Sequence, residues 1–253
     1  MSKIIIKLGG SLITQKTRKD FPTNINEIKK RANEFIRYNV LKQLAKEISS
    51  LKDVELIVIN GAGPFGHFLV NKKTDPRTIH SSVELLNQKI IDIFKQENKD
   101  LVAVHPCETC LFEENFQTDK LWNKTKQILQ NNKIPITYGD VILTEKGYKV
   151  ISGDDLATDL AKRWKADKII MVTDVEGVYT KNPEIYSDAR LILKLKEMRD
   201  IQFETNNIDI TGGLQSKVKK LLGVDIPSQI INGSEPGNIK KAIKGESIGT
   251  IVG

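Results

Sequence analysis

Residues 56–67 decide the fold of this chain, and they read LIVINGAGPFGH. The apolar run at residues 56–59 is typical of a buried strand. Three glycines follow within six residues, at positions 61, 63 and 66. Because these residues carry little side-chain bulk, the backbone N–H groups of such a loop can face an anion closely. His67 ends the loop, and an imidazole there can carry positive charge near neutral pH and hold a phosphate.

Strands and helices alternate on both sides of this stretch. Further strands are expected at residues 3–8, 101–104, 134–138, 168–172, 229–231 and 249–252. Helical spacing of apolar residues predicts one long helix over 25–48 and others over 83–94, 121–129, 155–164, 213–222 and 236–243. Residues 12–21 and 173–183 are expected as loops, residues 141–151 as a hairpin, and residues 191–207 show no clear pattern.

The order of these elements predicts the fold class. Strands that alternate with helices pair in parallel through right-handed crossovers. We therefore expect an α/β protein, a three-layer α/β/α sandwich with a mainly parallel central sheet plus a β-hairpin. Ligands of such sheets bind at the carboxyl ends of the strands.

Composition limits the classes of partner. The chain has 253 residues, of which 39% are hydrophobic and 28% charged, and this suits one or two globular domains. It has no apolar run of about 18 residues and no apolar N-terminal stretch long enough for a signal peptide, so a cytoplasmic protein without a membrane span is expected. The net charge is +7, but the basic residues are scattered and aromatics make up 6%. A small anionic molecule is therefore a better candidate partner than a nucleic acid.

The two cysteines form a Cys-x-x-Cys motif at Cys107 and Cys110, with His105 nearby. Such a pair could be redox-active or half of a zinc site. A structural zinc site needs about four ligands, and the chain has no second pair. We interpret both residues as ordinary thiols and predict no metal ligand among the protein side chains.

Cationic and glycine-rich segments follow several of the expected strands. Lys7 ends the first strand and precedes Gly9 and Gly10, so its ammonium and the loop N–H groups could hold one phosphate together. Lys16 follows on the next loop. Residues 211–217 open a helix, whose N-terminus favours anions, and Lys217 stands one turn into it. Several lysines and glycine loops at one sheet edge suit phosphoryl transfer, a reaction that depends on positioning and charge neutralisation.

Each of these features also has an ordinary structural interpretation. Lys7 could be a solvated strand end, the glycine pairs could simply make turns, and Asp154, Asp155, Asp159 and Asp174 could be helix caps or surface carboxylates. The usual phosphate-binding motif Gly-x-x-x-x-Gly-Lys-Ser/Thr is absent, as are Gly-x-Gly-x-x-Gly after a first strand and the Gly-x-Ser-x-Gly motif of α/β-hydrolases. If the chain is a kinase, it uses another type of phosphate site.

The motifs, taken in order, resemble those of the amino acid kinase superfamily, and within it the isopentenyl phosphate kinases of the archaeal type. The resemblance covers residues 3–252. The segments that carry it are KLGGS at 7–11, GAGPFGH at 61–67, YGD at 138–140, ISGDD at 151–155, TDVEGVY at 173–179, DITGG at 209–213 with Lys217, and NG at 232–233.

This resemblance implies an ATP-dependent kinase and a role for each matched residue. The ATP phosphates would be held by Gly9, Gly10, Ser11, Gly63, Gly213 and Lys217. Asp174 and Tyr179 would lie near the adenosine, and Lys7 and Lys16 would neutralise the transferred phosphoryl group. Ala62, His67 and Gly153 would contact the acceptor, a small phosphomonoester whose own phosphate oxygen attacks. Mg²⁺ would bridge the β- and γ-phosphates.

The resemblance also implies a homodimer. In each chain, residues 1–165 would form the acceptor-binding half, with the first glycine-rich loops, and residues 166–253 the nucleotide-binding half.

One position departs from the pattern, because Pro64 stands where the family has serine. Proline lacks both the hydroxyl and the backbone N–H, so one possible phosphate donor is missing. Three functions stay open from the sequence: phosphorylation of isopentenyl phosphate to the diphosphate, a kinase of the same fold with another acceptor such as a fosfomycin-like phosphonate, and a non-catalytic ATP-binding sensor.

Overall fold

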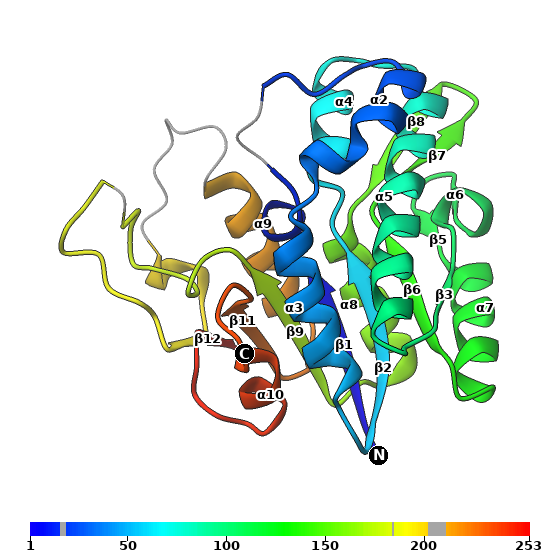
Figure 1. Ribbon diagram of the computed structural model, residues 1–253. Helices are drawn as coiled ribbons and strands as arrows, with labels where there is room; N and C mark the ends of the chain where they lie inside the picture. Colours follow the sequence, from blue (N-terminus) through cyan, green and yellow to red (C-terminus); the bar gives the residue numbers. More distant parts are fainter. Residues whose placement is uncertain (16–18, 184, 202–210) are drawn as a thin grey trace.

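The centre of the molecule is an eight-stranded sheet (Figure 1). The computed structural model describes residues 1–15, 19–183, 185–201 and 211–253. Across the sheet the strands are β10 (Lys194–Leu195), β12 (Thr250–Val252), β11 (Ser228–Asn232), β9 (Lys168–Thr173), β1 (Ser2–Leu8), β2 (Val54–Asn60), β6 (Ile134–Tyr138) and β3 (Leu101–Ala103). Neighbouring strands are parallel except β11 and β12, which are antiparallel. The predicted parallel sheet is confirmed.

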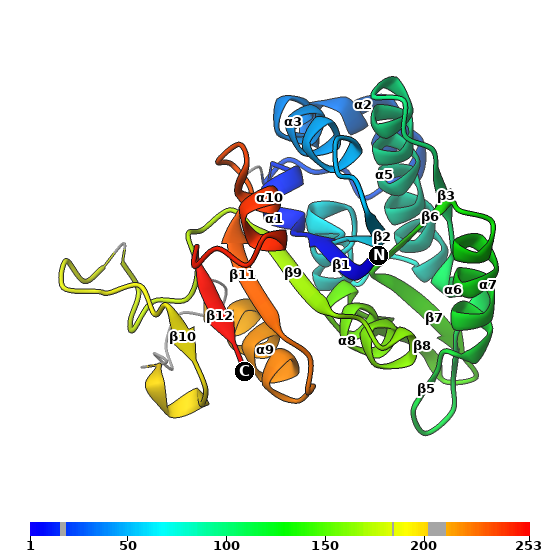
Figure 2. The ribbon, with the colours of Figure 1, turned by 90° about the horizontal axis from the view of Figure 1, so that it is seen from below.

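Helices cover both faces of this sheet (Figure 2). One face carries α2 (Ile25–Arg31), α3 (Tyr38–Ser49), α5 (Pro76–Gln96) and α10 (Asn238–Ile243). The other carries α7 (Asp119–Gln130), α8 (Gly153–Trp164) and α9 (Thr211–Leu222). Successive residues of a strand point to opposite faces. Accordingly, Ile4 and Ile6 pack in the first core and Ile5 in the second, which is why β1 is apolar at every central position.

Shorter elements complete the chain. The predicted hairpin is formed by β7 (Asp140–Thr144) and β8 (Gly147–Ile151), and a second, unpredicted one by β4 (Leu111–Phe112) and β5 (Phe116–Gln117). The short helices are α1 (Gly10–Ile13), α4 (His67–Asn71) and α6 (Pro106–Thr109), with 3-10 turns η1 (Ala32–Phe35), η2 (Gly63–Phe65) and η3 (Met198–Asp200). Within the described residues, no helix is long and apolar enough to cross a membrane.

The prediction of one helix over residues 25–48 is wrong, because the chain leaves helical geometry at Ile36. There the backbone is extended, and Ile36 pairs with Thr14 in an antiparallel bridge. Gln15 N donates to Phe35 O at 2.8 Å, and Arg37 N donates to Ile13 O at 2.9 Å. The apolar spacing continues across the break, since α2 and α3 bury their apolar faces in the same core.

The predicted loop over residues 12–21 is also partly wrong. Its first residues belong to α1, where Leu12 and Ile13 are fully buried. The segment without a pattern, residues 191–207, contains β10 and η3, and its part from residue 202 onward lies outside the described residues. Elsewhere the helices mostly begin earlier than predicted. Helix α5 starts at Pro76, where the carboxylate of Asp75 accepts from Arg77 N at 2.9 Å.

Candidate active site

The loops after β1 and β2 interlock at the carboxyl edge of the sheet. Gly61 N donates to Leu8 O at 2.8 Å, so the second loop starts against the end of β1. A Cβ added at Gly10 would collide with the backbone N of Gly63, and one at Gly61 would lie 2.6 Å from Gly10 N. Gly63 also has a φ of +51°, in the left-handed region that favours glycine. These glycines therefore let two backbone loops meet and form one cradle.

Beside this cradle, one carboxylate bridges two lysines. Asp154 Oδ1 lies 3.0 Å from Lys7 Nζ, and Asp154 Oδ2 lies 3.1 Å from Lys217 Nζ. The side chains of Lys7, Asp154 and Lys217 are 8%, 15% and 12% exposed. Lys7 comes from the end of β1, Asp154 from the first turn of α8 and Lys217 from α9. Three elements far apart in the sequence thus bring two ammonium groups to one place.

A capping box sets the position of Asp154. Ser152 Oγ accepts from Asp155 N at 3.1 Å, and Asp155 Oδ2 accepts from Ser152 N at 3.2 Å. This fixes the start of α8 at Gly153 and leaves Asp154 in its first turn. A Cβ at Gly153 would lie 3.5 Å from Lys7 Cε, which is van der Waals contact, so the start of α8 lies directly beside the lysine stem. The box is supported by Lys220, whose Nζ lies 2.7 Å from Asp155 Oδ1.

The bridge formed by Lys7, Asp154 and Lys217 carries a net positive charge. Burial alone raises the pKa of the Asp154 carboxyl, but the charges of Lys7 and Lys217 outweigh it and hold that pKa well below its usual range. Burial, followed by repulsion from Lys7, lowers the pKa of Lys217 to about 8, against the attraction of Asp154. At neutral pH two ammonium groups therefore face one carboxylate, and the trio carries one net positive charge. Such a site attracts a phosphate oxygen.

The loop after β1 also contacts the end of β9 through Ser11. Ser11 Oγ donates to Asp174 Oδ1 at 2.7 Å, and Thr173 Oγ1 donates to the same oxygen at 3.2 Å. Gly9 N donates to Val172 O at 2.7 Å. The loop after β1 is thereby fixed against the loop after β9. Tyr179 lies farther along that second loop, in an isolated bridge with Leu191.

His67 is the first residue of α4 and is exposed at its N-terminal end. The two residues that precede the helix in the loop, Phe65 and Gly66, are buried, and the Phe65 ring packs edge-on against Phe21 at 4.9 Å between centroids. Pro64 lies in the turn η2, near its first position, where its fixed φ suits a helical start. The proline is thus compatible with the loop backbone, and the glycine loop leads directly into α4 at His67.

The structure brings most of the predicted residues to this edge. Lys7, Gly9, Gly10, Ser11, Ala62, Gly63, His67, Gly153, Asp174 and Lys217 follow or adjoin the carboxyl ends of β1, β2, β9 or the hairpin. Gly213 lies in the first turn of α9, and Lys16 lies outside the described residues.

Sequence reasoning missed Asp154 and Lys220. The sequence leaves Asp154 among possible helix caps and surface carboxylates, whereas in the structure Ser152 is the N-cap and Asp155 its partner in the capping box. The pattern Ser152-x-x-Asp155 is the available signal, because it pairs Ser152 with Asp155 and leaves Asp154 without a capping role.

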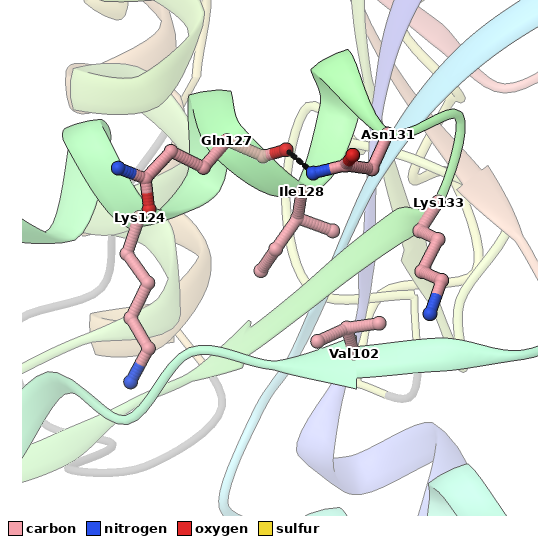
Figure 3. A pocket seen from close by; sticks show the side chains of 6 residues that line it. All are labelled: Val102, Lys124, Gln127, Ile128, Asn131 and Lys133. Atoms are coloured by element: carbon pink, nitrogen blue, oxygen red, sulfur yellow. Dashed lines mark hydrogen bonds between the residues drawn. The ribbon is translucent and has the colours of Figure 1, made fainter.

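A separate surface hollow lies away from this edge. It has a volume of about 520 Å³ and opens between β3 and α7 (Figure 3). Its lining, within the described part of the chain, consists of Val102, Lys124, Gln127, Ile128, Asn131 and Lys133. Its lining includes none of the predicted site residues that the structure describes, so the hollow is separate from the glycine cradle.

The chain is similar to known proteins in sequence and in fold. The model of the amino acid kinase family matches residues 2–224. Isopentenyl phosphate kinases of Methanothermobacter thermautotrophicus and Methanocaldococcus jannaschii are each 29% identical to this chain, over 97% of it and 96% of their own length. A solved isopentenyl phosphate kinase superimposes with a TM-score of 0.81 at 28% identity, over 99% of this chain and 100% of the other. UMP kinase from Bacillus anthracis shares the fold, with a TM-score of 0.66 at 20% identity over 99% of this chain and 95% of its own.

Proposed function

Because the chain belongs to the amino acid kinase family, we propose that it transfers the γ-phosphoryl group of ATP to the phosphate of isopentenyl phosphate, giving isopentenyl diphosphate. The observation that carries this proposal is the Asp154 carboxylate that holds the ammonium groups of Lys7 and Lys217 together beside two interlocked glycine loops. Phosphoryl transfer needs positioned positive charge around the migrating group, and this arrangement supplies it.

Each residue has a part in this proposal. Lys217, with Gly9, Gly10, Ser11, Gly63 and Gly213, holds the ATP phosphates, and Asp174 and Tyr179 lie near the adenosine. Lys7, assisted by Lys16, neutralises charge on the transferred group. Asp154 acts as a positioning residue, since it fixes both ammonium groups without needing to contact substrate. Ala62, His67 and Gly153 contact the acceptor.

The acceptor chemistry explains why the site can work without a strong base. A phosphate monoester is largely a dianion near neutral pH, so its oxygen attacks without first losing a proton. A positively charged imidazole at His67 would bind this dianion and orient it. Mg²⁺ would be held mainly by the ATP oxygens, since Asp154 is already engaged by two lysines, and it would supply further charge neutralisation.

We also propose the arrangement that accompanies this activity. Residues 1–165 bind the acceptor and residues 166–253 the nucleotide, on one continuous sheet. The working enzyme is a homodimer in the cytoplasm, and it takes neither nucleic acid nor membrane as a partner.

An acceptor panel tests the proposal. ADP release is measured with isopentenyl phosphate, UMP, glutamate and a fosfomycin-like phosphonate at matched concentrations. We expect kcat/KM for isopentenyl phosphate to exceed that for each of the others by about 100-fold or more. Preference for another acceptor would replace the substrate assignment. ATP binding without turnover of any acceptor would favour the non-catalytic sensor.

A further inference from the structure

Three groups with metal-ligand chemistry meet outside the candidate active site. They are the imidazole of His80, the thiol of Cys107 and the carboxylate of Asp140, and their ligand atoms all lie within 4.8 Å of one another. His80 belongs to α5, Cys107 to α6 and Asp140 to the start of β7. The phosphoryl-transfer residues include none of the three.

Two of the three ligands are already oriented. His80 Nδ1 lies 2.9 Å from Asp140 Oδ2, and Asp140 Oδ1 accepts from Val141 N at 2.8 Å. The Asp140 side chain is fully buried, while that of His80 is 23% exposed and leaves a path from solvent. These contacts hold the imidazole and the carboxylate in fixed positions within the cluster.

Carboxylates surround the cluster. Besides Asp140 itself, the charges of Glu84 and Glu108 act on both His80 and Cys107. Such a negatively charged environment would attract a divalent ion.

We propose that His80, Cys107 and Asp140 form a binding site for Zn²⁺, with a fourth position open to water or an external ligand. Mixed nitrogen, sulfur and oxygen donors suit zinc, whereas Mg²⁺ and Ca²⁺ prefer oxygen donors alone. The ion ties α5 and α6 to the first strand of the hairpin. It stabilises the acceptor half of the molecule and takes no part in phosphoryl transfer.

Cobalt titration tests the site. Untagged protein is stripped with a chelator and titrated with Co²⁺ in the absence of nucleotide, and the thiolate-to-metal charge-transfer band is recorded. We expect a stoichiometric band, its displacement by Zn²⁺, and a rise in the thermal unfolding temperature with Zn²⁺. Cys107→Ala should abolish the band, and both Cys107→Ala and His80→Asn should weaken Zn²⁺ binding by about tenfold or more.

Cys110→Ala is the matched control, because Cys110 lies three residues away, is buried and is outside the cluster. It should keep the band. Unfolding curves recorded without metal verify that each variant is folded. Absence of the band in the wild-type protein, its survival in Cys107→Ala, or its loss in a folded Cys110→Ala protein would each overturn the proposal.

Discussion

Replacing Asp154 with asparagine tests most directly the bridge that its carboxylate forms between Lys7 and Lys217. The change keeps the shape of the side chain but removes the charge that faces Lys7 and Lys217 at 3.0 and 3.1 Å. Removing one partner of a buried ion pair typically costs about 3–5 kcal/mol, because the remaining charge is left uncompensated. Asparagine can still accept a hydrogen bond, so we expect the lower end, about 3 kcal/mol at pH 7. In a chain of this size that lowers Tm by about 6–12 °C.

The part of this stability loss that arises from Lys217 is limited, because this lysine can lose its proton. Its pKa is about 8 in the folded protein against an ordinary 10.5, so at pH 7 the charged form is favoured over the neutral form by only about 1 kcal/mol. Loss of Asp154 therefore adds at most about 1 kcal/mol through Lys217, and Lys7 with the lost hydrogen bonds accounts for the rest.

Because of this limit, the stability of the Asp154→Asn variant depends on pH in a characteristic way. With Lys217 neutral in the folded variant, the unfolded chain binds the extra proton, so the stability of the variant rises from pH 7 to 8. The wild-type stability stays nearly flat there and rises only above the folded pKa, toward pH 10.5. The difference in the free energy of unfolding between the wild-type protein and the variant should therefore shrink by about 1 kcal/mol between pH 7 and 8.

Urea unfolding of both proteins at several pH values measures this difference in the free energy of unfolding. Asp119→Asn is the control, since its ion pair with Arg163 at 2.8 Å is just as short but the aspartate is 75% exposed, and such pairs contribute under about 1 kcal/mol. We expect Asp154→Asn to lose more than about 1 kcal/mol of unfolding free energy at pH 7, and to lose less at pH 8. A smaller loss at pH 7, or a loss that grows toward pH 8, would refute the idea that one carboxylate compensates two buried ammonium groups.

Three further changes probe the rest of the site. Gly10→Ala puts a methyl group against the backbone N of Gly63, so stability should fall by about 1–3 kcal/mol in thermal unfolding and ATP turnover should fall with it. The rate at subsaturating ATP should decline as pH rises through about 8, where Lys217 loses its charge. Lys217→Arg should remove that decline, because arginine stays charged. An unchanged pH profile in the arginine variant would show that another group causes the decline. His67→Gln should raise KM for the phosphorylated acceptor by about 10–100-fold, the loss of a charge-assisted hydrogen bond, with little change in KM for ATP; an equal rise in both would deny His67 an acceptor role.

The parallel sheet could be predicted because its strands are buried on both faces and therefore read as continuous apolar runs, as in residues 56–59. The break between α2 and α3 could not be predicted in the same way. It depends on the bridge between Thr14 and Ile36, a contact between distant segments, while the apolar spacing of the two helices continues across it.

The residues of the candidate site also divide into those marked by local sequence features and those that depend on contacts between distant segments. Glycine loops, a lysine at a strand end and a lysine near the start of a helix are local features, so Gly10, Lys7 and Lys217 could be singled out from the sequence. Asp154 could not be separated from its neighbouring aspartates by composition, since burial and the approach of α9 decide its role. The cluster of His80, Cys107 and Asp140 is harder still, because its members come from three elements and form no spaced motif.

Phosphorus NMR of the reaction product tests the central claim most directly. The protein is incubated with ATP, Mg²⁺ and isopentenyl phosphate, and the acceptor phosphorus is followed. We predict that its single resonance is replaced by the coupled pair of a diphosphate as ATP becomes ADP, and that Lys7→Ala abolishes the change. ATP hydrolysis to inorganic phosphate with the acceptor resonance unchanged would contradict phosphoryl transfer to a phosphate acceptor.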